Sequence, residues 1–189
     1  SYAGELGYVI KLLGHAQPQT PATVQPCLVA KTGQLAQIGG ALNAVEFTAE
    51  PVQTVLCTGP GAGAGPTASA VLADVIDVAA SRGGLAFGLR VGQLARATRK
   101  KDKQARRYYL RLMVMDETGV LSAVTSILRD QQISVESMLQ KGQSDDKPVA
   151  LVLTTHPTAP DQIKAACSSL SSASFVSGAV MALPIVDEA

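Results

Sequence analysis

A run of alternating glycines between two apolar segments is the part of this sequence best suited to bind a ligand. Residues 59–74 read GPGAGAGPTASAVLAD. The apolar residues 52–57 before the run predict a buried strand, and the apolar residues after Pro66 recur at helical spacing as far as residue 80. Glycine lets the backbone approach a ligand closely, and the free N–H groups of a helix start favour negative charge. The loop is therefore suited to a phosphate or a carboxylate.

The same glycines also suit a tight strand-to-helix turn without a ligand, and spacing alone leaves both interpretations open. Gly59, Gly61 and Ala64 fit the dinucleotide fingerprint G-x-G-x-x-A. That fingerprint belongs to a βαβ unit with an acidic residue about 20 positions further on. The sequence offers neither, because a basic stretch follows the helix. We therefore expect the loop to touch a cofactor without being its main binding site.

The second half of the chain shows a regular order of strand-like and helical patterns. They predict a strand around residues 110–114, a helix over 120–128, strands around 133–139 and 149–155, a helix over 163–170 and a last strand around 176–180. This βαββαβ order is the ferredoxin-like arrangement. A domain of roughly 80 residues buries only about 60 % of its unfolded surface, so we expect it to pair with another copy.

Residues 108–138, YYLRLMVMDETGVLSAVTSILRDQQISVESM, resemble the ACT domain, a small regulatory module that binds amino acids in metabolic enzymes. The shared features are a strand that ends at Asp116, a turn glycine at Gly119 and the phrase QISV at residues 132–135. In that family the strand-to-helix turn binds the effector, usually between paired domains. The resemblance thus implies an effector-binding role for Asp116 and Gly119. An acidic residue beside a helix start is also a common cap, and this alternative stays open for Asp116.

The first half contains the phrases LGYVIKLLGHA, VQPCLVA, IGGALNAVEF and CTGPGAGAGPTASAVLADVIDVA. In that order they resemble the last third of the catalytic region of homoserine dehydrogenases, whose bacterial members commonly carry a C-terminal ACT domain. The resemblance implies NAD(P)-dependent interconversion of homoserine and aspartate semialdehyde, on the route to threonine and methionine. It places Gly59, Gly61, Ala62 and Gly63 beside the cofactor, with Gly63 as the best single contact.

The resemblance also implies that the catalytic lysine, the substrate-holding acids and the principal dinucleotide fold precede Ser1. Lys11 lies in the phrase VIKLLG and does not match the catalytic lysine. We therefore expect a fragment with no catalytic residue, no cofactor bound by the chain itself and no dehydrogenase activity. An amino acid, with threonine the first candidate, would be its effector. A free-standing amino-acid sensor or dimerisation protein is the alternative.

Charge divides the chain into three parts. Nine of the 16 basic residues lie between residues 82 and 107, against the single acid Asp102, whereas the rest of the chain has seven basic residues and 14 acids. The nine are Arg82, Arg90, Arg96, Arg99, Lys100, Lys101, Lys103, Arg106 and Arg107. This pattern is typical of a solvated linker, and we expect residues 96–107 to be solvated. A nucleic-acid patch is the less favoured alternative, because aromatic residues are not interleaved.

We therefore predict an α+β protein with α/β layers. Residues 1–81 would be part of a mixed-sheet homoserine dehydrogenase catalytic domain, residues 82–107 a basic linker and residues 108–189 a ferredoxin-like ACT domain. Pairing of these domains predicts a homo-oligomer.

Composition limits the remaining classes. The chain has 189 residues, is 47 % hydrophobic and has a net charge of +1, which suits a globular protein with no polyanionic partner. It has no apolar run of 18 residues and no secretory leader, so we expect no membrane partner and a cytoplasmic location. Cys27, Cys57 and Cys167 lie far apart, which favours small buried thiols over a disulfide or a metal site.

Overall fold

The computed structural model describes residues 1–18, 20–85, 88–95, 101–141 and 147–186, and the chain divides into two compact units. Unit 1 joins Ser1–Ala36 to Lys100–Glu188, and unit 2 is Gln37–Arg99. The predicted boundaries at residues 81 and 107 differ from these units. The physical reason is strand pairing, because the first 36 residues share a sheet with the end of the chain.

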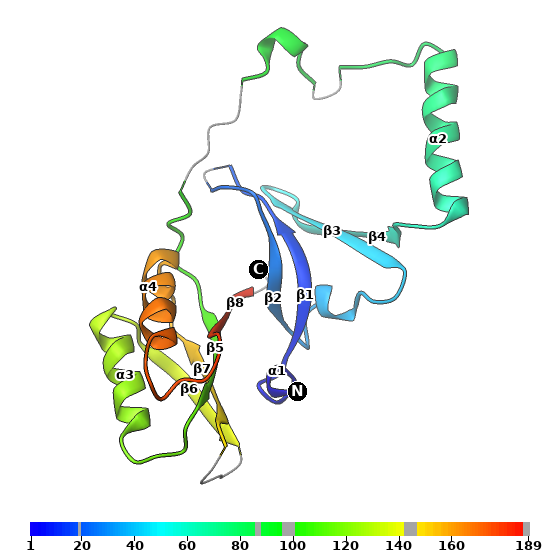
Figure 1. Ribbon diagram of the computed structural model, residues 1–189. Coiled ribbons are helices and arrows are strands. Elements are labelled where there is room, and N and C mark those ends of the chain that lie inside the picture. Colours follow the sequence, from blue (N-terminus) through cyan, green and yellow to red (C-terminus); the bar gives the residue numbers. More distant parts are fainter. Residues whose placement is uncertain (19, 86–87, 96–100, 142–146, 187–189) are drawn as a thin grey trace. The chain divides into compact units, whose positions relative to one another are not determined.

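Unit 1 is built on a six-stranded sheet with the order β1-β2-β8-β5-β7-β6 (Figure 1). Its strands are β1 (Tyr8–His15), β2 (Thr23–Ala30), β5 (Tyr108–Val114), β6 (Val135–Lys141), β7 (Val149–Thr155) and β8 (Met181–Val186). Neighbouring strands are antiparallel except β2 and β8, which pair in parallel through Leu28 with Ile185 and Val29 with Val186. The sheet is thus mixed, as predicted.

Helices α3 (Val120–Asp130) and α4 (Pro160–Ser171) lie on one face of this sheet (Figure 1). Alternate residues of β5 and β7 point to the helices, and Leu110, Leu112 and Leu153 are no more than 1 % exposed. Val124, Leu128 and Leu170 meet them from the helices, and all belong to one apolar cluster. The order β5-α3-β6-β7-α4-β8 confirms the predicted βαββαβ arrangement.

The opposite face of the sheet is partly covered by the first residues of the chain. Ala3 of the short helix α1 (Tyr2–Glu5) packs with Tyr109, Val152 and Ile185, and Leu28 of β2 joins the same cluster. Tyr109 and Val152 belong to β5 and β7, so the segment that resembles homoserine dehydrogenase shares a core with the predicted ACT domain.

The predicted last strand around residues 176–180 is wrong by several positions. β8 begins at Met181, whereas Val176 forms only an isolated bridge with Val114. Gly178 has a φ of +77°, a value outside the extended region, so the backbone turns there before β8 starts.

Unit 2 contains the hairpin of β3 (Leu42–Ala49) and β4 (Gln53–Pro60), followed by α2 (Ala64–Ala79). The predicted helix and the predicted strand are both confirmed, but the prediction that the strand at residues 52–57 is buried is wrong. None of the described residues in these three elements is buried, and Phe47, Leu72 and Ile76 are 58 %, 59 % and 55 % exposed. The apolar pattern is present, but a two-stranded sheet encloses no core unless a helix or further strands pack on it, and α2 packs little against β3 and β4.

The end of the basic stretch is ordered rather than solvated. Arg106 pairs with Asp102 at 2.8 Å, and its backbone exchanges two hydrogen bonds with Thr158. Arg107 pairs with Glu136, and the side chains of Arg106 and Arg107 are only 18 % and 22 % exposed. The prediction of solvated residues is therefore wrong for these two, while residues 96–100 lie outside the described part of the chain.

Candidate functional site

The predicted effector turn joins the end of β5 to the start of α3. Gly119 is the N-cap of α3 and has a φ of +95° and a ψ of −16°, the left-handed conformation that glycine adopts without a steric penalty. The turn closes through hydrogen bonds from Val120 N to Glu117 O at 3.3 Å and from Ala123 N to Gly119 O at 2.9 Å. A glycine at position 119 is therefore required by the backbone itself, with or without a ligand.

Asp116 is half-buried and contacts a residue that the sequence did not reveal. Nε2 of Gln140 on β6 donates a hydrogen bond to Oδ1 of Asp116 at 3.0 Å. Gly119, and not Asp116, is the N-cap of α3, and the hydrogen bond recorded for the Asp116 carboxylate comes from Gln140. Only the pairing of β6 with β7 brings Gln140 to the turn, since the two residues are 24 positions apart.

This turn brings a hydrogen-bond acceptor, the Asp116 carboxylate, close to hydrogen-bond donors, the backbone N–H groups at the start of α3. The carboxylate of Asp116 is able to accept an ammonium group, and the N–H groups of the first turn of α3 favour a negative charge. Both charges of an amino acid can therefore be met within a few residues.

The predicted cofactor residues Gly59, Gly61, Ala62 and Gly63 are brought together at the end of β4 and the start of α2. Gly63 is the N-cap of α2, with a φ of +115° that L-residues with a side chain rarely adopt. A Cβ atom on Gly61 would lie 1.8 Å from Nδ2 of Asn43, a residue of β3 that pairs with Gly59. Two of the three glycines are thus fixed by the fold of unit 2, which supports the interpretation as a tight turn.

The same loop also fits a negatively charged group at the start of α2. The first turn of this helix has no acidic residue, and its N-cap, as described, forms no side-chain hydrogen bond. A Cβ on Gly59 or Gly65 would meet no described atom within 4 Å, so space remains beside the backbone. The two interpretations are therefore compatible, because the glycines that shape the turn also leave its N–H groups accessible. The side chain of Asn43, which sequence reasoning missed, occupies the space where a side chain at position 61 would lie.

A third polar cluster lies at the far end of β6 from Gln140. Glu136 accepts hydrogen bonds from Nε of Arg107 at 3.0 Å and from Oγ1 of Thr154 at 3.3 Å. The hydrogen bond from Arg107 holds the pKa of the Glu136 carboxyl below its ordinary value. Burial opposes the charged form of Arg107, but its hydrogen bonds to Glu136 and Tyr8 outweigh burial and raise the pKa of the guanidinium. No sequence pattern linked these residues.

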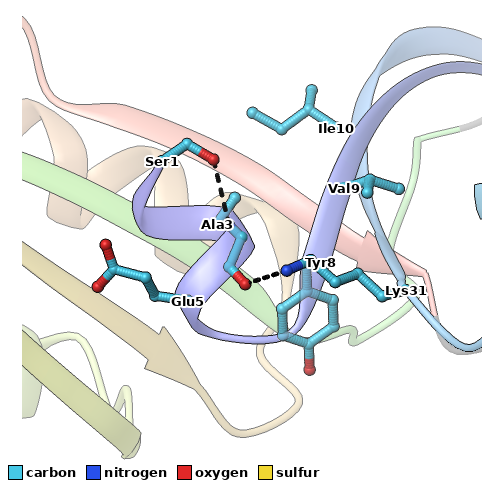
Figure 2. A pocket seen from close by; sticks show the side chains of 8 residues that line it. Ser1, Ala3, Glu5, Tyr8, Val9, Ile10 and Lys31 are labelled. Carbon is cyan, nitrogen blue, oxygen red and sulfur yellow. Dashed lines mark hydrogen bonds between the residues drawn. The ribbon is translucent and has the colours of Figure 1, made fainter.

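A cavity of about 500 Å³ lies beside α1 and the start of β1 (Figure 2). Its lining is Ser1, Ala3, Gly4, Glu5, Tyr8, Val9, Ile10 and Lys31. The Lys31 ammonium donates to the carbonyl of Gly4, and Gly4 N donates to Ser1 Oγ at 3.3 Å. None of the predicted cofactor or effector residues lines this cavity.

Metal ligands, cysteine thiols and apolar helices are three further features of the described residues that bear on function. No cluster of three or more His, Cys, Asp or Glu side chains suited to a metal ion occurs in the described ranges. Burial raises the pKa of the Cys27 and Cys167 thiols, as for small buried side chains. Cys57 is exposed, so the prediction of a buried thiol is wrong at that position. Among the described helices, none combines the length and the apolar character that crossing a membrane requires.

The two modules match two known families. Residues 1–76 match the family model of homoserine dehydrogenase, and residues 108–170 match that of the ACT domain. The first segment is thus similar to homoserine dehydrogenase and the second to the ACT domain, which confirms both resemblances. The predicted effector turn falls within the ACT match, and the glycine loop falls within the homoserine dehydrogenase match.

Individual relatives agree with these matches. The chain is 38 % identical to the homoserine dehydrogenase of Neisseria gonorrhoeae over 180 residues and 35 % identical to that of Helicobacter pylori over 160 residues. These alignments cover 89 % and 83 % of this chain but only 41 % and 38 % of the relatives. The solved homoserine dehydrogenase of Thiobacillus denitrificans is 35 % identical, with a TM-score of 0.82, and is matched over 98 % of this chain and 44 % of that one. The chain thus spans less than half the length of the relatives it matches.

Proposed function

We propose that this chain is the C-terminal part of an NAD(P)-dependent homoserine dehydrogenase that interconverts homoserine and aspartate semialdehyde. The observation that carries the proposal is the joint match of the chain, in one order, to a homoserine dehydrogenase segment and an ACT domain. The likeness to the Thiobacillus denitrificans structure extends over both modules, since it covers 98 % of this chain. The proposed enzyme serves threonine and methionine biosynthesis in the cytoplasm.

The glycine loop is the proposed contribution of this chain to cofactor binding. The nicotinamide cofactor supplies or accepts the hydride when it is bound. Gly59, Gly61, Ala62 and Gly63 would border it with their backbone, and the first turn of α2 would favour its negative charge. Among the described residues no strand parallel to β4 follows α2, so the loop lacks the βαβ unit of a complete dinucleotide site. Its role is to complete a site whose main part lies elsewhere in the enzyme.

The ACT domain is the proposed regulatory part, and threonine is the proposed effector. Its ammonium group would pair with Asp116, and its carboxylate would face the N–H groups beside Gly119. Gln140 would orient the carboxylate of Asp116, since it already donates to Oδ1. Pairing of two copies would complete this pocket, and the functional protein is therefore proposed to be a homo-oligomer.

The test is an assay of the complete gene product that contains this chain. We expect homoserine-dependent reduction of NAD or NADP, and inhibition of that reaction by threonine. Activity without inhibition would assign the ACT domain to another effector or to dimerisation. Failure to reduce either cofactor, together with amino-acid binding, would instead favour a free-standing amino-acid sensor.

A further inference from the structure

Strand β6 carries an irregularity that redirects one acidic side chain. The pairing of β6 with β7 shifts between Val135 and Ser137, so that Glu136 is an extra residue in the ladder. As a result, two consecutive side chains reach the same residue of β7. Ser137 Oγ lies 2.6 Å from Thr154 Oγ1, and Thr154 Oγ1 donates to Glu136 Oε2 at 3.3 Å. Bulges at sheet edges commonly re-aim a side chain in this way.

The redirected carboxylate meets Arg107, which is also bound to the other edge of the sheet. Both Nε and Nη2 of Arg107 donate to Glu136 Oε2, at 3.0 Å and 2.5 Å. The Arg107 side chain also forms a hydrogen bond with Tyr8, the first residue of β1. Strands β1 and β6 are the two edge strands of the six-stranded sheet. Arg107 therefore connects elements that do not pair with each other.

The side chains of this pair lie at the surface but are less exposed than those of the Arg129–Asp130 pair. The side chains of Arg107 and Glu136 are 22 % and 34 % exposed, whereas those of the Arg129–Asp130 pair are 74 % and 64 % exposed. Exposed pairs contribute little, because water and salt screen them. Charge-assisted hydrogen bonds in a partly buried network are stronger. The cluster of Tyr8, Arg107 and Glu136 is thus able to hold α1 and β1 in position.

We propose that Arg107 is a positioning residue that fastens the α1–β1 segment to edge strand β6 and transmits changes in β6 to that segment. Gln140, which holds Asp116 of the effector turn, lies four positions after Glu136 on the same strand. A ligand ammonium group that pairs with Asp116 shares this carboxylate with Gln140, and so changes the constraints on β6. The α1–β1 segment belongs to the homoserine dehydrogenase match. The claim that Arg107 transmits effector binding therefore rests on the proposed function. The contacts of Arg107 with Tyr8 and Glu136 do not depend on that function.

The first test uses the 189-residue chain without ligand and measures amide hydrogen exchange. We compare the wild type with Glu136→Gln, Tyr8→Phe and the double variant, and we use Asp130→Asn as the matched control. In Glu136→Gln we expect the amides of Leu6 and Lys31, which bond to Tyr2 O and Gly7 O, to exchange about three- to tenfold faster. The amides of Leu151–Leu153 in the core strand β7 report global opening. If Glu136 only stabilised the whole fold, exchange would become faster by the same factor at Leu6, at Lys31 and in Leu151–Leu153.

The double variant decides whether the three residues act as one unit. Both single substitutions act through Arg107, so the double variant should exchange more slowly than the product of the two single effects predicts. Asp130→Asn should leave the exchange of α1 and β1 unchanged. Independent effects of the two substitutions, or equal acceleration in β7, would overturn the proposal.

The second test adds threonine and separates this inference from the proposed function. Threonine should change exchange at α1 and β1 in the wild type, and this change should be lost in Glu136→Gln although calorimetry still detects binding. If threonine binds both the wild type and Glu136→Gln and changes exchange at α1 and β1 equally in the two, transmission through Arg107 is refuted. Absence of threonine binding to the wild type would count against the proposed effector, and the ligand-free comparison would then decide the connection alone.

Discussion

Nε2 of Gln140 and Oδ1 of Asp116 are joined by a hydrogen bond of 3.0 Å, which ties strand β6 to the turn that enters α3. The carboxylate is thereby held at the rim of the turn instead of capping the helix. A side chain that is already oriented loses less conformational entropy when it binds a ligand. This relationship makes Asp116 the most informative residue for testing regulation.

Threonine is expected to stabilise the 189-residue chain against heat, and Asp116→Ala is expected to abolish this effect. A ligand that binds only the folded state contributes about 2.7 kcal/mol at a concentration of 100 times Kd. For a domain of this size, that corresponds to a rise in Tm of several degrees. Differential scanning fluorimetry over a series of threonine concentrations measures the shift.

Glu117→Ala is the matched control for this experiment, because Glu117 is the exposed neighbour of Asp116. It should retain the full shift. An unchanged shift in Asp116→Ala would remove Asp116 from the effector site.

Three glycine-to-alanine substitutions should separate the steric demands of the loop before α2. Gly61→Ala places a Cβ against Asn43, and Gly63→Ala forces alanine to a φ of +115°. Gly63→Ala should destabilise the start of α2 by about 1–3 kcal/mol because of the strained backbone. Gly61→Ala should cost less, because the exposed Asn43 side chain can move away. Gly65→Ala meets open space within the helix and should stabilise it by about 0.5–1 kcal/mol. Hydrogen exchange of the Thr67 amide, which bonds to Gly63 O, reports these changes locally.

The same series in the complete gene product tests cofactor binding. Gly63→Val should raise KM for NAD(P), because a branched side chain prevents close approach of the backbone. If Gly63→Val has the same KM for NAD(P) as the wild type, the loop has a structural role only.

The 189-residue chain alone should not reduce NAD(P) in the presence of homoserine. Hydride transfer requires that cofactor and substrate be held in contact, and the described residues contain one glycine loop without a complete βαβ unit. Calorimetry should likewise detect no tight dinucleotide binding. Turnover that depends on homoserine, above a heat-inactivated control, would contradict the expectation.

The Arg107–Glu136 pair should make stability depend on pH in the acidic range. The pKa of Glu136 is lowered in the folded state, so the unfolded chain binds the proton more readily, near the ordinary value of 4.5. The stabilisation is therefore fully present above that value and is lost as the pH falls through the lower pKa of the folded state. Melting curves of the wild type and Glu136→Gln should differ at neutral pH and converge in acid. The Tm of Asp130→Asn should follow that of the wild type over the whole pH range. A difference in Tm between Glu136→Gln and the wild type that does not change with pH would show that the charge of Glu136 is not its cause.

The sequence determined those features that depend on local periodicity. The strand with alternating apolar residues around 110–114, the continuous apolar strand at residues 149–155 and the helix after Pro66 were predicted because period and composition act within a few residues. The βαββαβ order followed from the succession of these patterns. Gly63 was predicted as a loop residue for the same reason, since a positive φ is a local requirement.

Tertiary structure alone decided which distant segments meet. The parallel pairing of β2 with β8 joins residues more than 150 positions apart, and no local pattern specifies it. The same applies to Gln140 at Asp116, to Asn43 beneath Gly61 and to Arg107 between Tyr8 and Glu136. Local periodicity identifies which side of an element is apolar, whereas the partner that covers it depends on backbone hydrogen bonding and packing across the whole chain. Residues 52–57 show this difference, because their apolar pattern predicts burial but nothing among the described residues encloses them.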